Sequence, residues 1–325
     1  MENLLEISDL HVEYKVGKSV ARALNGVDLT IRKGEALGLV GESGAGKTTT
    51  ALSILKLLPK RNATIKKGSI MFEGKDIIKA KEPEMMKLRG QGISMVFQNP
   101  LTSLNPVFTV GEQIGMSLKS HTKLSAAEIK ERTCRLLEEV GINRIRVNDY
   151  PNQFSGGMRQ RVGIAAALAC NPKLIIADEP TTALDVTIQA QILDLIKKII
   201  NERNSSMLMI THNLGIVGEL CNRVAVMYAG RIIEIGTIKE VFKNPLHPYT
   251  RGLFSSIPKL KGERKPLEII PGSIASALHV PGGCPFHPRC AKCSEICKTE
   301  IPKQVKAGVD HWVACHCYIG GEADA

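Results

Sequence analysis

A glycine-rich segment near the N-terminus has the residues to hold a chain of phosphates. It reads Gly41-Glu-Ser-Gly-Ala-Gly-Lys-Thr48. Its glycines let backbone N–H groups approach an anion without a Cβ in the way, and the following helix points its positive end at the same anion. We expect Lys47 to bridge the β- and γ-phosphates and the Thr48 hydroxyl to ligate Mg²⁺. The predicted nucleotide site comprises Gly41, Ser43, Gly44, Ala45, Gly46, Lys47, Thr48 and Thr49.

Two adjacent carboxylates have the chemistry for hydrolysis. Asp178 and Glu179 directly follow residues 174–177, an apolar run typical of a buried strand. A carboxylate at such a strand end suits a Mg²⁺ ligand, which is the role predicted for Asp178. Glu179 projects differently and can orient an attacking water as general base. The alternative interpretation is a purely structural pair of carboxylates.

The elements around these residues predict an α/β fold. Residues 36–40 read as a buried strand that enters the phosphate loop, and a helix is expected over residues 49–58. Strands and helices then alternate, which predicts a parallel sheet with helices on both faces. Before them, residues 5–31 alternate between apolar and polar and predict antiparallel strands with turns at Gly17 and Gly26.

Composition and charge exclude several classes of protein. The 325 residues carry a net charge of +11, yet aromatic residues make up only 4% and no stripe interleaves them with the lysines. This pattern favours a solvated or membrane-adjacent surface over a nucleic-acid interface. The longest apolar stretches fall short of the roughly 18 residues that a membrane helix needs. The first residues lack the basic and apolar regions of a secretory signal.

Four further motifs occur in a fixed order around the phosphate loop and the carboxylates. Residues 154–161 read Phe-Ser-Gly-Gly-Met-Arg-Gln-Arg and lie one helix ahead of the strand that ends at Asp178. Gln98 follows Met-Val-Phe, Asp185 follows Ala-Leu, and His212 follows Ile-Thr. With this order and these separations, the chain resembles the ABC-type ATPases along essentially its whole length.

The resemblance implies a P-loop NTPase fold of the ABC type. Such a fold has a mixed sheet, an antiparallel β subdomain, a helical subdomain carrying the signature motif at about residues 99–172, and here a small Cys-rich C-terminal domain. It implies that Glu179, His212 and Gln98 act in catalysis of ATP hydrolysis, and that Gln98 also ligates Mg²⁺ beside Thr48 and Asp178. Tyr14 is implied to stack on adenine, although an aromatic residue on a strand is otherwise a core residue.

The signature motif implies a second subunit. Ser155, Gly156 and Gly157 precede a helix and form another amide-rich helix N-terminus suited to an anion. In the ABC family this motif, together with the loop of Asp185, closes over the ATP held by a facing subunit. The implied partner is a homologous ABC ATPase subunit in a heterodimer.

Three stretches narrow the resemblance to one subfamily. Residues 97–106, 244–250 and 283–290 look like the ATPase subunits of oligopeptide, dipeptide and nickel importers. Such subunits lie peripherally at the cytoplasmic face of the membrane, under two transmembrane permease subunits. An extracytoplasmic solute-binding protein delivers the solute to these permeases. Peptide is the predicted cargo and nickel the alternative. A soluble ABC ATPase acting on nucleic acid is disfavoured, because the chain has one phosphate loop and no heptad run.

Six of the nine cysteines crowd into the C-terminal tail: Cys284, Cys290, Cys293, Cys297, Cys315 and Cys317. Without an export signal, a metal site is favoured over disulfides. The subfamily resemblance implies a [4Fe–4S] cluster on Cys284, Cys290, Cys297 and Cys315, but thiolates also suit Zn²⁺. The extra cysteines leave the ligand set open, and unligated reduced thiols are the third possibility. Frequent prolines after residue 245 predict two domains, an ATPase domain at 1–245 and an extension at 246–325.

Overall fold

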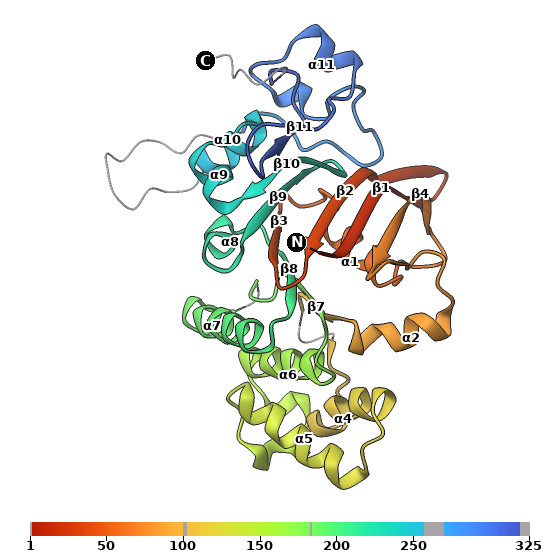
Figure 1. The fold of residues 1–325 in the computed structure, drawn as a ribbon, viewed down its shortest axis with the longest axis vertical. Helices are drawn as coiled ribbons and strands as arrows, with labels where there is room; N and C mark the ends of the chain where they lie inside the picture. Colours follow the sequence, from red (N-terminus) through yellow and green to blue (C-terminus); the bar gives the residue numbers. More distant parts are fainter. Residues whose placement is uncertain (1, 100–102, 183, 257–269, 319–325) are drawn as a thin grey trace. The chain divides into compact units, whose positions relative to one another are not determined.

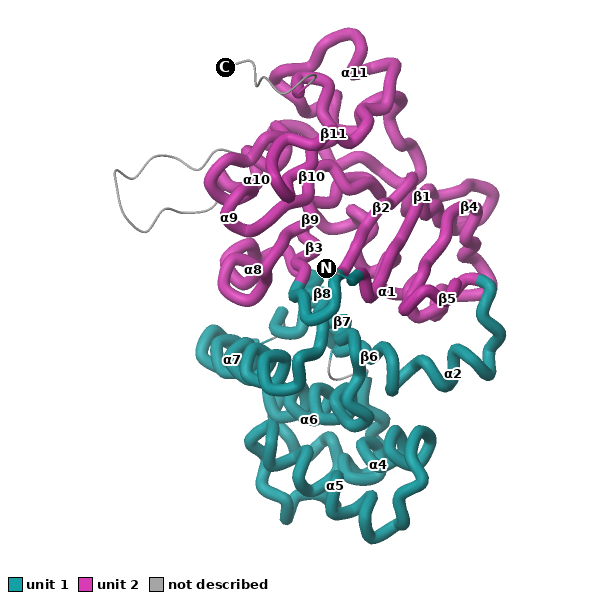
Figure 2. The backbone as a smooth tube through the Cα atoms, in the orientation of Figure 1, with its two compact units in different colours: residues 1–2, 32–36, 79–210 teal, residues 3–31, 37–78, 211–325 magenta. Residues whose placement is uncertain are grey.

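The structure, a computed structural model, describes residues 2–99, 103–182, 184–256 and 270–318. Its residues form two compact units, which Figure 2 colours separately. Unit 1 comprises Met1–Glu2, Arg32–Ala36 and Lys79–Ile210. Unit 2 comprises Asn3–Ile31, Leu37–Ile78 and Thr211–Ala325.

Unit 1 contains three parallel strands in the order β8-β7-β6. They are β6 (Ile93–Val96), β7 (Leu174–Asp178) and β8 (Ser206–Ile210). Every residue of β7 and β8 is buried, as expected for short apolar strands covered on both faces. The strand predicted ahead of Glu179 is therefore confirmed.

The remaining elements of unit 1 are mainly helices. They are α2 (Glu82–Gln91), α4 (Val110–His121), α5 (Ala126–Glu139), α6 (Gly156–Leu168) and α7 (Val186–Arg203), with short 3-10 turns at Arg144–Asn148 and Pro151–Gln153. Helices α4, α5 and α6 pack against one another (Figure 1). Thr109 and Ser125 begin α4 and α5 with capping boxes, in which Glu112 and Glu128 reach back to the cap residue.

Unit 2 contains an antiparallel sheet with the order β2-β1-β4-β5. Its strands are β1 (Asn3–Val16), β2 (Ser19–Arg32), β4 (Ala63–Phe72) and β5 (Lys75–Asp76). The predicted turn at Gly17 is confirmed, but the predicted turn at Gly26 is wrong because Gly26 lies within β2. A Cβ on Gly26 would lie 3.1 Å from Asp9 Oδ1, so the glycine serves a close approach at φ +93° instead of a turn.

A second set of strands in unit 2 has the order β11-β12-β10-β9-β3. These are β3 (Ala36–Val40), β9 (Arg223–Tyr228), β10 (Arg231–Thr237), β11 (Val305–Lys306) and β12 (Trp312–Val313). Strand β3 is parallel to β9, whereas β10 is antiparallel to both β9 and β12. The chain after residue 300 thus extends the same sheet that contains β3.

The helices of unit 2 are short. They are α1 (Lys47–Ile54), α8 (Leu214–Leu220), α9 (Ile238–Lys243), α10 (Pro248–Ser255) and α11 (Glu295–Thr299), with a 3-10 turn at His287–Arg289. Helix α1 ends at Ile54, four residues before the predicted end, and Lys56 just beyond it takes a left-handed φ of +53°. Among the described residues of either unit, no helix has the length and apolar character to cross a membrane.

Candidate active site

The phosphate loop in unit 2 has a backbone that requires glycine at two positions. Gly41 has φ +152°, and a Cβ there would lie 2.2 Å from the carbonyl oxygen of Met227. Gly46 has φ +110°, and a Cβ there would lie 2.8 Å from the carbonyl oxygen of Ala23. Neither neighbour can give way, because both are backbone atoms. The loop is thus fixed by strand β9 on one side and by strand β2 on another.

Lys47 and the start of α1 give the loop its charge. The Lys47 ammonium donates to the carbonyl oxygens of Gly41 (2.7 Å) and Glu42 (3.0 Å), and the side chain is buried. Gly46 caps α1 without a side chain, so no side-chain oxygen occupies the N–H groups of the first turn. Ser43, Gly44 and Thr48 are exposed. The exposed part of the loop therefore offers amides and the Thr48 hydroxyl to an anion, and the buried Lys47 ammonium lies within the same loop.

The carboxylates at the end of β7 in unit 1 have different environments. Asp178 is buried, at 3% exposed. Glu179 is half-buried and takes a left-handed φ of +45°, held by its own N–H, which donates to the Ile210 carbonyl (2.8 Å). Its Oε2 accepts from Gln98 Nε2 and from Thr182 Oγ1, both at 2.9 Å. Two donors hold one oxygen in place, so the carboxylate is oriented.

The signature motif and the start of α7 lie together in unit 1. The Ser155 hydroxyl accepts from the N–H of Met158 and begins α6, and the Asp185 carboxylate accepts from the N–H of Ile188 (2.9 Å) and begins α7. A Cβ on Gly157 would lie 2.5 Å from Ile188 Cγ2, which shows how closely the two helix starts approach. Ser155, Gly156 and Asp185 are exposed. The motif is thus a surface feature formed at two helix N-termini.

Two other predicted residues belong to unit 2. Tyr14 lies on β1 opposite Ala63 and is half-buried, which leaves part of its ring accessible. His212 follows β8 and is exposed, just before Asn213, whose side chain accepts from the N–H of Gly215 and begins α8. Unit 2 therefore carries the phosphate loop, Tyr14 and His212, and unit 1 carries Gln98, the carboxylates, the signature and Asp185.

Sequence reasoning missed three contacts of these residues. Thr182 donates to Glu179, Tyr249 accepts from the N–H of Glu42 (2.9 Å), and Arg289 donates to the Glu42 carboxylate (2.7 and 3.2 Å). The sequence carries one signal for the last contact: a carboxylate inside an anion-binding loop needs a cation beside it. The hydrogen bond with Glu42 raises the pKa of the Arg289 guanidinium, and this effect outweighs burial, which lowers it.

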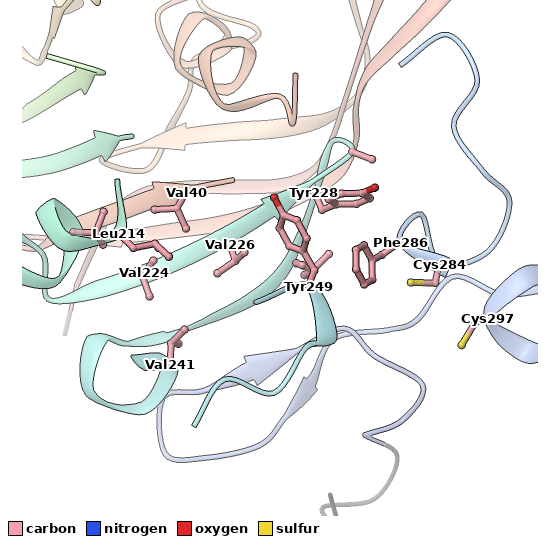
Figure 3. Packing of buried hydrophobic residues seen from close by; sticks show 13 residues of the cluster. Val40, Leu214, Val224, Val226, Tyr228, Val241, Tyr249, Cys284, Phe286 and Cys297 are labelled. Carbon is pink, nitrogen blue, oxygen red and sulfur yellow. The ribbon is translucent and has the colours of Figure 1, made fainter. Parts of the chain in front are cut away.

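The C-terminal cysteines lie partly in the apolar core of unit 2. Cys284 and Cys297 are buried in a cluster with Tyr228, Tyr249 and Phe286 (Figure 3). Burial raises the pKa of Cys284 to about 11 and that of Cys315 to about 12, so both thiols are neutral at pH 7. The neighbouring thiols of Cys297 and Cys290 add to the rise at Cys284.

The predicted cluster or zinc site at these cysteines is not confirmed. Among the residues that the structure describes, no group of three or more His, Cys, Asp or Glu side chains is arranged to hold a metal ion. The two histidines nearby direct one ring nitrogen each at a carbonyl oxygen, His287 at Cys284 (3.0 Å) and His316 at Glu300 (2.9 Å). In this arrangement Cys284 and Cys297 lie in the apolar core, and Cys290 and Cys293 pack against it.

Comparison with known proteins places these motifs in one family. The ABC transporter family model matches residues 24–182, and the model of the oligopeptide/dipeptide transporter C-terminal region matches residues 233–297. The chain is 47% identical to the oligopeptide transport ATP-binding protein AppD of Bacillus subtilis, over 98% of each chain. It is 44% identical to the dipeptide transport ATP-binding protein DppD of the same organism, over 99% of each chain.

A solved structure shows the same similarity. The dimeric structure of a post-hydrolysis state of the ATP-binding cassette MJ0796, bound to ADP and Pi, has a TM-score of 0.65 and 29% identity with this chain. The match covers 72% of this chain and 98% of that one. The fold around the phosphate loop and the signature is thus that of an ATP-binding cassette.

Proposed function

Because the chain belongs to the ABC transporter family of ATP-binding proteins, we propose that it hydrolyses Mg–ATP to energise an importer of peptides. The choice of peptides as the cargo rests on one observation. Residues 233–297 match the oligopeptide/dipeptide transporter C-terminal region. The relatives described above are named for oligopeptides and dipeptides, which does not favour the nickel alternative. The domain boundary near residue 245 stays a prediction.

The chemistry proposed for hydrolysis uses the oriented Glu179. Its carboxylate takes a proton from the attacking water, while Gln98 and Thr182 hold its Oε2. Lys47 supplies a positive charge to the phosphates, and the first-turn amides of α1 donate hydrogen bonds to them. Thr48, Asp178 and the amide oxygen of Gln98 are hard oxygen donors, which suits Mg²⁺. His212 is the proposed contact to the γ-phosphate, and Tyr14 the proposed adenine platform.

The proposed partners follow from the exposed signature. Ser155–Gly157 and Asp185 face solvent in this chain, and an anion site of this kind complements the ATP held by a second, homologous subunit. The related cassette that was solved as a dimer supports this pairing. We place the pair at the cytoplasmic face of the membrane, under two permeases and an extracytoplasmic solute-binding protein. Nucleic acid has no part in it.

Reconstitution in liposomes tests the function. The chain is combined with its partner ATPase and two permeases, and phosphate release is measured with and without peptide-loaded binding protein. We expect peptide-loaded binding protein to raise the turnover several-fold, and nickel or oligonucleotides to leave it unchanged. Stimulation by DNA or RNA, without association with permeases, would overturn the importer proposal.

The [4Fe–4S] cluster on Cys284, Cys290, Cys297 and Cys315, with Zn²⁺ as its alternative, stays a prediction. The packing of Cys284, Cys290 and Cys297 at one apolar cluster supports it, because it keeps these three thiols in one region of unit 2. Metal binding must deprotonate these thiols and bring them together. We expect anaerobic purification to yield brown protein with iron and labile sulfide. Stoichiometric zinc without sulfide would reject the cluster, and metal-free protein would reject both.

A further inference from the structure

A residue of the C-terminal extension contacts the phosphate loop itself. Arg289 Nη1 lies 2.7 Å from one carboxylate oxygen of Glu42, and Arg289 Nη2 lies 3.2 Å from the other. Glu42 directly follows Gly41 within the loop, and 247 residues separate it from Arg289. Both residues belong to unit 2. The pair is bidentate, which is the strongest geometry for a guanidinium and a carboxylate.

The surroundings of Arg289 fix its position. Its side chain is 5% exposed, and its Nε donates to the carbonyl oxygen of Pro271 (2.9 Å). Its guanidinium carbon lies 5.9 Å from the ring centroids of both Tyr228 and Phe286, which themselves pack edge to face at 5.3 Å. The guanidinium therefore has little freedom to leave Glu42.

The same aromatic cluster also holds the backbone of Glu42. The N–H of Glu42 donates to the hydroxyl of Tyr249, whose ring lies 4.7 Å from that of Tyr228 and 5.4 Å from that of Phe286 (Figure 3). Phe286 comes from the same short segment as Arg289. Arg289 thus holds the side chain of Glu42, and Tyr249 holds its backbone N–H. The segment 284–290 helps to position both groups.

Without a counter-charge, the Glu42 carboxylate would weaken the binding of phosphates to the loop. A carboxylate next to Gly41 lies beside the site that we propose for a triphosphate, and like charges at short range in a half-buried setting repel strongly. Building on the proposed function of the loop, we propose that Arg289 is a positioning residue for ATP binding, which neutralises Glu42 and so sets the phosphate affinity of the loop. The C-terminal extension thereby completes the nucleotide site of its own subunit.

Opposite effects of two substitutions test this proposal. Arg289→Met removes the cation and leaves Glu42 unneutralised, so we expect the Kd for Mg–ATP to rise on the order of tenfold. Glu42→Gln removes the anion and leaves the cation, so we expect the Kd to stay the same or fall. The double variant should return to within about twofold of the unmodified chain, because the two charges are removed together. Calorimetric titration of the full-length chain with a slowly hydrolysed ATP analogue and Mg²⁺ gives these values.

A docking role alone predicts a different pattern. If the ion pair only attached the extension, breaking it from either side would raise the Kd to the same extent, and that result would overturn the proposal. An unchanged Kd in Arg289→Met would overturn it as well. The Arg289→Met effect should shrink at high salt, since repulsion between charges is screened.

Arg223→Met is the matched control. Arg223 is another buried arginine of unit 2, 3.2 Å from Asp310, and it lies outside the proposed nucleotide site. We expect it to lower the melting temperature and leave the Kd unchanged. Should Arg289→Met fail to fold, Glu42→Gln and Arg289→Lys still decide whether a change in the ion pair raises or lowers the Kd for Mg–ATP. If the unmodified chain binds no ATP, the proposed function fails and the role of Arg289 fails with it, a result distinct from those above.

Discussion

Replacement of Glu179 by Gln is expected to lower ATP turnover by about 10²–10⁴-fold in the reconstituted transporter, because a positioned general base is lost. The amide is nearly isosteric, and its oxygen can still accept from Gln98 and Thr182 as the Oε2 of Glu179 does. The oriented geometry is retained while the basicity disappears. We therefore expect Mg–ATP binding to persist and the ATP-bound dimer to accumulate, detectable by size-exclusion chromatography.

The control for this variant is another carboxylate of unit 1. Glu202 on α7 makes a surface ion pair with Lys198 at 3.9 Å, and such exposed pairs contribute little. Glu202→Gln should hydrolyse ATP at the rate of the unmodified chain. Near-normal hydrolysis by the Glu179→Gln transporter would contradict the role of Glu179 as general base.

The parts of the fold that sequence predicted well are those with local causes. Strand β3 is five consecutive apolar residues, and all five are buried. The loop that follows needs glycine for reasons that lie within a few ångströms of its own backbone, as the clash of a Cβ on Gly41 with Met227 shows. Ser155 and Asp185 are helix caps, and a cap is defined by its side chain and the next three residues.

The parts that sequence failed to predict depend on distant partners. A glycine alone predicts a break in a strand, whereas Gly26 stays within β2 and leaves space for the side chain of Asp9 on the neighbouring strand. The contact between Glu42 and Arg289 joins the phosphate loop to the far end of the chain. Cysteine spacing predicts ligands only if the thiols converge. Burial of Cys284 and Cys297 in an apolar cluster was not visible from spacing.

Replacement of Gly156 by Asp is expected to abolish transport-coupled hydrolysis without unfolding the chain. Gly156 has no left-handed φ, and among the described residues a Cβ there would meet Leu184 Cδ2 alone, at an ordinary 3.8 Å. An Asp at this position also suits the N-terminus of α6. The added carboxylate would, however, occupy the place at which we propose that the facing subunit's triphosphate binds. We expect turnover to fall by at least about 10²-fold, comparable to the loss of an anion-stabilising group.

Binding and stability measurements separate this effect from damage to the subunit itself. The isolated variant should bind Mg–ATP with the Kd of the unmodified chain, because its own phosphate loop is intact, and its melting temperature should not fall. Gly163→Asp on the same helix is the control, since a Cβ at Gly163 meets no atom of the described part of the chain within 4 Å and the residue lies two turns beyond the helix start. It should leave turnover unchanged. If Gly156→Asp hydrolysed ATP normally in the assembled transporter, the signature of this chain would not close on a partner's nucleotide, and the proposed two-subunit site would be wrong.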